Sequence, residues 1–107
     1  MKIGGYDGEA DLLFQISAVG LPTPIRQAKI IPDRRFRWDF TWPDRKLAVE
    51  IQGSTWVPNT GHTSGTGLAR DYEKNNEAVL QGYRCLYFTS DMVKSGVAVS
   101  ILERALA

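Results

Sequence analysis

The sequence is poor in the residues that build disulfides and zinc sites. Its 107 residues include one cysteine, Cys85, and one histidine, His62. A lone cysteine excludes an internal disulfide, and one histidine weighs against zinc sites, which need several nitrogen or sulfur ligands. Without a second histidine the serines lack a general base, so a Ser-His-Asp hydrolase is unsupported. There is no phosphate-cradling P-loop either.

Long hydrophobic runs and a net charge of one sign are also missing. Charged residues or glycines interrupt every apolar stretch well before the roughly 20 residues of a membrane span, and nothing resembles a signal peptide. We therefore expect a soluble protein with no membrane partner, located in the cytoplasm, or in the host cytoplasm if a phage encodes it. The net charge of +1 gives no overall attraction to a polyanion. The length and the 43% hydrophobic content predict one domain over residues 1–107.

The hydrophobic pattern predicts an α/β fold. Apolar residues at helical spacing predict helices over 8–19, 68–81 and 97–105, the second with Leu68, Tyr72, Val79 and Leu80 available for the core. Strands are expected over 25–31 and over 83–89, the latter covered on both faces. The glycine-rich segment 53–67 is too long for an idle connection and is a candidate substrate loop.

Two further strands carry the clearest pattern in the chain. Four aromatic residues alternate with polar ones and predict one aromatic face; they are Phe36, Trp38, Phe40 and Trp42. Alternation resumes over 47–52, after a turn at Asp44 and Arg45. That turn pairs Trp42 with Leu47, Phe40 with Val49 and Trp38 with Ile51.

The same register places Asp39 directly opposite Glu50. Facing residues have Cβ atoms about 5 Å apart, where two like charges repel. A divalent cation such as Mg²⁺ would relieve that repulsion, since it prefers carboxylate oxygens. The alternatives are neutralisation by Arg35 or Arg37, or a turn of another length that shifts the register. On the cation interpretation, removing either acid should leave the fold intact.

The order of the elements around Asp39 and Glu50-Ile51-Gln52 resembles the core of the PD-(D/E)XK nuclease superfamily, particularly its small Vsr-like and phage-type members. The resemblance covers most of the chain. It implies an αβββαβα restriction-endonuclease-like core with a mixed four-stranded sheet flanked by helices. It also implies that Asp39, Glu50 and the Ile51 backbone carbonyl bind Mg²⁺ or Mn²⁺.

The sequence departs from the family motif at Gln52, where the family usually has lysine. Some members carry glutamine there, and others move the lysine to the following helix, where Lys74 is the candidate. A solvated Lys74 paired with Glu73 or Glu77 is the alternative. The family often adds a first-helix carboxylate to the metal site. Glu9 fits that role, although an acid near a helix start also complements the helix dipole.

Between Arg26 and Lys46 the chain carries seven basic and three acidic residues, either a phosphate-contacting patch or a solvated strand face. The residues expected to contact nucleic acid are Arg35, Arg37, His62 and Arg70. A loop histidine without a role is the alternative for His62. The sequence thus predicts a metal-dependent endonuclease for DNA, with no organic cofactor and with Asp39, Glu50, Gln52 and Lys74 catalytic.

Two other classes of function remain open. One is a catalytically silent nucleic-acid-binding module on the same fold, which Gln52 makes credible. The other is a structural or assembly protein with Trp42 and Trp56 as exposed interface anchors. A homodimer is compatible with the nuclease interpretation, because cutting both strands can need a second copy of the protein.

Overall fold

The computed structural model describes residues 5–52 and 65–107. The helices among them are α1 (Gly8–Ala18), α2 (Gly65–Leu80), α3 (Ser90–Ser95) and α4 (Val97–Ala105). The strands are β1 (Ile25–Ala28), β2 (Trp38–Trp42), β3 (Leu47–Gln52) and β4 (Arg84–Thr89). The expected αβββαβα order is therefore present, with the last helical segment divided into α3 and α4. No helix in this part of the chain has both the length and the apolar character needed to cross a bilayer.

The strands form one mixed sheet in the order β1-β2-β3-β4. The first two pairings are antiparallel, and β3 and β4 run parallel after the α2 crossover. A single 3-10 turn, Pro43–Arg45, joins β2 to β3 and ends at Lys46 in the left-handed conformation, with φ of 50°. The predicted register is confirmed where β2 meets β3, since Phe40 faces Val49 and Trp42 faces Leu47.

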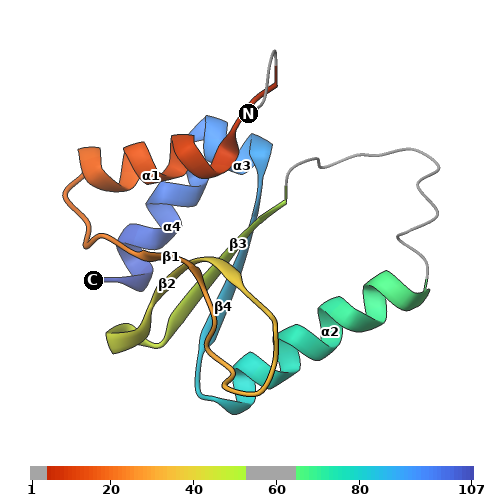
Figure 1. The fold of residues 1–107 in the computed structure, drawn as a ribbon. Helices are drawn as coiled ribbons and strands as arrows, with labels where there is room; N and C mark the ends of the chain where they lie inside the picture. The colour runs from red at the N-terminus through yellow and green to blue at the C-terminus, as the bar shows by residue number, and fades with distance from the viewer. Residues whose placement is uncertain (1–4, 53–64) are drawn as a thin grey trace.

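Helices cover both faces of the sheet (Figure 1). Helices α1, α3 and α4 gather on one face, and α2 lies across the other. The larger cluster of buried side chains lies on the three-helix face and includes Leu12, Phe40, Val49 and Leu102. A smaller cluster joins Trp38 and Ala48 of the sheet to Ala78 of α2. The functional residues discussed below lie around the end of β3, between these two layers.

The prediction of one continuous aromatic face is wrong. Phe40 and Trp42 belong to the larger cluster, whereas Trp38 belongs to the smaller one and Phe36 packs against it. Regular β2–β3 pairing begins at Phe40. Before that point, the backbone N–H of Ile51 donates to the Asp39 side chain instead of to a strand carbonyl. Trp38 still pairs with Ala28 of β1, but the neighbouring Gln27 has a left-handed backbone, and side-chain alternation breaks between Trp38 and Phe40.

Helix α2 also departs from the prediction. It begins at Gly65 and so includes the last three residues of the expected 53–67 loop. Tyr72, Val79 and Leu80 are exposed and do not enter the core, while the small side chain of Ala78 is fully buried. The helix thus turns its more polar side toward the sheet.

Three other expectations need correction. The first predicted strand is shorter than 25–31 and ends at Ala28. The strand predicted over 83–89 is not covered on both faces, because Tyr87 is exposed. Trp42 is buried and donates its indole N–H to the carbonyl of Pro22 at 2.8 Å, so it is no exposed interface anchor. Trp56 lies outside the described residues.

Candidate nuclease site

Asp39 lies where regular pairing between β2 and β3 stops, and its carboxylate takes over the hydrogen bonding there. Asp39 Oδ2 accepts from the backbone N–H of Ile51 at 2.7 Å. Its other oxygen, Oδ1, accepts from the Gln27 side-chain amide at 3.2 Å. The first bond ties Asp39 to the backbone of β3, immediately after Glu50. The expectation that removing Asp39 leaves stability unchanged therefore needs revision, since the Ile51 N–H would lose its partner.

Glu50 forms an ion pair with Lys74, which reaches it from α2. Both side chains are only 18% exposed. The Lys74 ammonium group also donates to the Arg37 carbonyl at 2.5 Å and stands 4.6 Å from the centre of the Trp38 ring. Lys74 is thus held against the sheet and does not pair with Glu73 or Glu77, which was the alternative.

Burial is the largest influence on the pKa of Glu50. Desolvation raises the pKa of the Glu50 carboxyl above its ordinary value, although the hydrogen bond and charge of Lys74 pull it down. The negative charges of Asp39 and Asp71 raise it further. The two acids that the hairpin register paired are therefore near enough to interact electrostatically.

Glu9 enters this region because the start of α1 packs closely on the end of β3. A Cβ atom on Gly8 would lie 3.3 Å from Ile51 Cγ2, so the glycine permits the close approach. Glu9 is in the first turn of α1 and forms an ion pair with Arg26 at 2.8 Å. The sequence placed Glu9 near a helix start but did not indicate this partner.

Gln27 links Glu9 to Asp39. Its amide nitrogen lies 3.4 and 3.5 Å from the two Glu9 carboxylate oxygens, in addition to its bond to Asp39. Gln27 has φ of 52°, a left-handed conformation that is uncommon for residues other than glycine. An amide donating to two carboxylates occupies a position that a cation would also favour.

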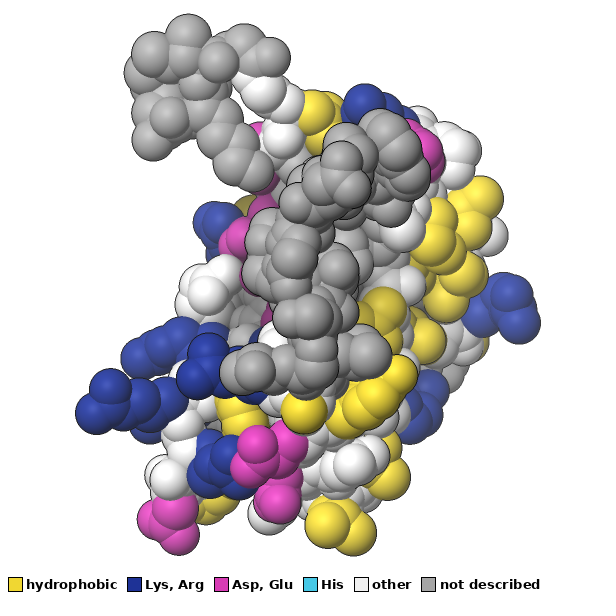
Figure 2. Space-filling view, turned by 90° about the vertical axis from the view of Figure 1, so that its right-hand side faces the viewer, with side chains coloured by type: hydrophobic (Ala, Val, Ile, Leu, Met, Phe, Trp, Pro, Cys, Tyr) yellow, Lys and Arg dark blue, Asp and Glu magenta, His cyan; other side chains and the backbone are white. Residues whose placement is uncertain are grey.

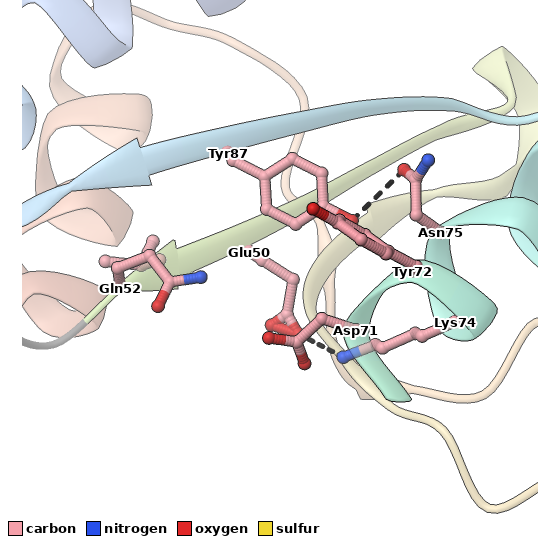
Figure 3. A pocket seen from close by; sticks show the side chains of 8 residues that line it. Glu50, Gln52, Asp71, Tyr72, Lys74, Asn75 and Tyr87 are labelled. Atoms are coloured by element: carbon pink, nitrogen blue, oxygen red, sulfur yellow. Dashed lines mark hydrogen bonds and ion pairs between the residues drawn. The ribbon is translucent and has the colours of Figure 1, made fainter. Parts of the chain in front are cut away.

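A pocket of about 470 Å³ opens beside Glu50, between β3, β4 and α2. Figure 3 shows Gln52 at one end, Lys74 at the other and Glu50 between them. The side chains that line it are those of Glu50, Ile51, Gln52, Asp71, Tyr72, Lys74, Asn75 and Tyr87. Gln52 and Lys74 thus face a common space, although β3 and α2 are far apart in the sequence.

A second pocket, of about 510 Å³, lies on the basic side of α2. It brings together Arg34, Arg35 and Arg70, with Asp33 and Glu73 beside them. Figure 2 shows basic side chains gathered along one edge of this face, with acidic side chains nearby. The predicted contact residues Arg35 and Arg70 therefore share one site. Arg37 instead donates to the Gln27 carbonyl at 3.1 Å, and His62 lies outside the described residues.

The oxygen-rich donor set suits Mg²⁺ or Mn²⁺ better than a softer metal. Asp39 and Glu50 supply carboxylates from neighbouring strands, and Glu9 adds a third through Gln27. Within residues 5–52 and 65–107, no three His, Cys, Asp or Glu side chains already form a cluster that could hold a metal. Instead, Lys74 forms an ion pair with Glu50. The Gln27 amide donates hydrogen bonds to Glu9 and to Asp39. A metal ion bound by these acids would have to displace Gln27 and Lys74 from them.

Comparisons with known proteins give the fold. No protein-family model matches the sequence. The search of curated proteins also returned no match. Among solved structures, the chain is similar to the Homing Endonuclease I-Bth0305I Catalytic Domain, with a TM-score of 0.68 and 17% sequence identity. The match covers 95% of this chain and 94% of that chain. The chain therefore shares its α/β fold with that catalytic domain.

The fold brings further residues to the site that were not expected to act there. Gln27 gave no signal, because nothing in the sequence reveals its left-handed backbone. Helical spacing places Asp71 and Asn75 on the same side of α2 as Lys74, but no role was expected for either. Tyr72 was expected in the core, and Tyr87 was expected to be covered.

Proposed function

We propose that this protein is a metal-dependent endonuclease of the PD-(D/E)XK type, with residues 1–107 acting as one domain that hydrolyses phosphodiester bonds in DNA. One observation carries the proposal. Asp39 and Glu50 lie on neighbouring strands, Asp39 accepts a hydrogen bond from the Ile51 N–H, and Glu50 and Ile51 line a pocket that Lys74 enters from α2. The similarity of the fold to a homing endonuclease catalytic domain supports the same activity.

Asp39, Glu50 and the backbone carbonyl of Ile51 would hold Mg²⁺ or Mn²⁺, with Glu9 as a further carboxylate. When bound, such an ion lowers the pKa of a coordinated water and offsets charge on the attacked phosphate. Gln27 would keep Glu9 and Asp39 together before binding. The Ile51 N–H holds Asp39 Oδ2 in place. Asp39 Oδ1, which now accepts from the Gln27 amide, would bind the cation in place of that amide.

In hydrolysis the attacking water gives a proton to solvent as its oxygen bonds to phosphorus, one P–O ester bond breaks, and the departing sugar oxygen takes up a proton from solvent. Gln52 would orient the water through its side-chain amide. Lys74 would neutralise the charge that develops on the phosphate oxygens, replacing the lysine missing at position 52. Its present contact with Glu50 already places the ammonium group at the pocket.

The second pocket would hold the flanking DNA backbone. Arg35 and Arg70 line it and are exposed, so their guanidinium groups can donate bidentate hydrogen bonds to phosphates. Arg37 lies on the same segment, just before β2, and would add a contact close to the acids. His62 remains a predicted phosphate contact. Cutting both strands would call for a second copy of the chain.

Incubation of supercoiled plasmid with Mn²⁺ tests the proposal. The wild-type protein should convert the plasmid to nicked or linear forms, and chelation of the metal should stop the reaction. Asp39→Asn should abolish the conversion, whereas Asp44→Asn, which changes an exposed acid in the β2–β3 turn, should not. Equal conversion by the wild-type and Asp39→Asn proteins would exclude the proposed site.

A catalytically silent DNA-binding module is the second candidate. It is favoured by the ion pair between Lys74 and Glu50, which already satisfies the acid without a metal. Such a module would bind DNA with affinity that falls steeply with salt, yet would leave the plasmid intact in both Mg²⁺ and Mn²⁺.

A further inference from the structure

We propose that the pocket between β3, β4 and α2 binds a nucleobase, and that the preferred substrate therefore presents an unpaired nucleotide next to the cleaved phosphate. This inference rests on the proposed nuclease function and deepens it. It concerns the part of the pocket where Tyr72 and Tyr87 lie beside Asn75.

Two tyrosines provide the surface for stacking. Tyr72 on α2 is 60% exposed and Tyr87 on β4 is 41% exposed, and both line the pocket. Exposed aromatic side chains from two separate elements, converging on one cavity, form a suitable surface for a flat aromatic ligand. Every nucleobase offers a π-face, so such stacking is tolerant of sequence.

The polar rim of the pocket suits the edge of a base. The Tyr87 hydroxyl donates to Asn75 Oδ1 at 3.1 Å, which fixes the orientation of the Asn75 amide. The Asn75 amide nitrogen then has no hydrogen-bond partner within residues 5–52 and 65–107, and its two N–H groups are available to base acceptors. Burial raises the pKa of Tyr87 to about 12, so its hydroxyl stays protonated and keeps donating.

The charges in the pocket favour a base over a phosphate. Glu50 and Asp71 both line it, and their negative charges repel a phosphate that lacks a metal. The basic pocket around Arg34, Arg35 and Arg70 is the better place for the backbone. A neutral base would therefore occupy the tyrosine side, with its own phosphate near Glu50 and Lys74 and the flanking backbone directed toward the arginines.

The pocket is also directly beside the proposed catalytic acids. Tyr87 is the β4 residue paired with Glu50 in the parallel register, so the two are neighbours across adjacent strands. A base stacked on Tyr87 would hold its own phosphate near Glu50. Bases within an intact duplex have both faces covered by their neighbours, so only an unpaired or displaced nucleotide can enter.

Fluorescence of 2-aminopurine provides the test. Two oligonucleotides carry this base, one fully paired and one with the base unpaired in a single-nucleotide bulge. Binding is measured in Ca²⁺, with fluorescence change and affinity read together. The wild-type protein should bind the bulged DNA more tightly and change its fluorescence.

Tyr72→Ala should weaken binding of the bulged DNA by between about 5-fold and about 150-fold, the range for loss of one stacked base, and should affect the paired DNA far less. Tyr72→Phe should restore bulge binding, because the ring remains. Phe14→Ala, which removes an exposed aromatic residue on α1 outside the pocket, is the matched control and should change the affinity for neither the bulged nor the paired DNA.

Equal losses on both DNAs, or no loss with Tyr72→Ala, would overturn the base pocket. A change of oligomeric state in Tyr72→Ala relative to the wild-type protein, measured by sedimentation, would also overturn it, because the tyrosines would then contact a second copy of the chain. Failure of the nuclease proposal looks different, since bulge-selective binding would persist while no DNA is cut in Mn²⁺.

Discussion

The Asp39 carboxylate accepts a hydrogen bond of 2.7 Å from the backbone N–H of Ile51. This contact replaces the regular strand pairing of β2 with β3 and fixes the proposed metal-binding acid against the strand that carries Glu50. Asp39 therefore has a structural role as well as the proposed chemical one.

Replacing Asp39 should separate these two roles. Asp39→Ala leaves the Ile51 N–H without its partner, and we expect it to lower the free energy of unfolding by about 1–3 kcal/mol in metal-free buffer. Asp39→Asn keeps a side-chain carbonyl that can accept the same bond, so its loss should be smaller. Both variants should fail to cut DNA. Urea unfolding curves check the stabilities, and equal losses for the two variants would contradict the assigned hydrogen bond.

Glu50→Gln should change how stability depends on pH. Burial raises the pKa of Glu50 in the folded protein. Such a group stabilises the fold at low pH, and this contribution is lost as pH rises through the raised pKa. From about pH 4 upward the wild-type protein should therefore lose stability relative to Glu50→Gln. Thermal unfolding in metal-free buffer at acid and neutral pH measures the difference. A relative gain by the wild-type protein over this interval would show that Lys74 outweighs burial.

Lys74→Met should destabilise the protein, because the largely buried negative charge of Glu50 loses its ion-pair partner. Both partners are 18% exposed, so a cost of about 1–3 kcal/mol is expected, between the values for surface and buried ion pairs. The double variant Glu50→Gln/Lys74→Met should lose less stability than Lys74→Met alone. Denaturant titration of all four proteins completes the cycle, and strictly additive effects would exclude coupling between the two side chains.

Several of these relationships could be predicted from the sequence. Alternation on either side of a short turn predicted the β2–β3 register. Helical spacing separated Lys74 from Tyr72 and Val79, but it did not predict that the Lys74 side of α2 faces the sheet. Trp38 could not be placed correctly, because a side-chain hydrogen bond interrupts the strand pairing that alternation assumes. Hydrophobicity likewise misassigned Tyr72 and Val79, since α2 packs through the small Ala78 instead.

Glu73→Gln should strengthen DNA binding. Glu73 forms an ion pair with Arg34 inside the basic pocket and so competes with phosphate for that side chain. Neutralising Glu73 frees the Arg34 guanidinium group to contact phosphate, so the slope of log affinity against log salt should steepen by about one unit. Arg70→Ala should make the slope shallower by a similar amount. Fluorescence anisotropy across a salt series measures both, and an unchanged slope for the two variants would exclude this pocket as a phosphate site.

Titration calorimetry with Mn²⁺ in the absence of DNA measures whether Asp39 and Glu50 hold a divalent ion together. We expect saturable binding to the wild-type protein, at least about tenfold weaker binding to Asp39→Asn and to Glu50→Gln, and unchanged binding to Asp44→Asn. A loss of one carboxylate ligand that costs about 1.4 kcal/mol corresponds to that tenfold change. Equal Mn²⁺ affinity in all four proteins would contradict the shared site.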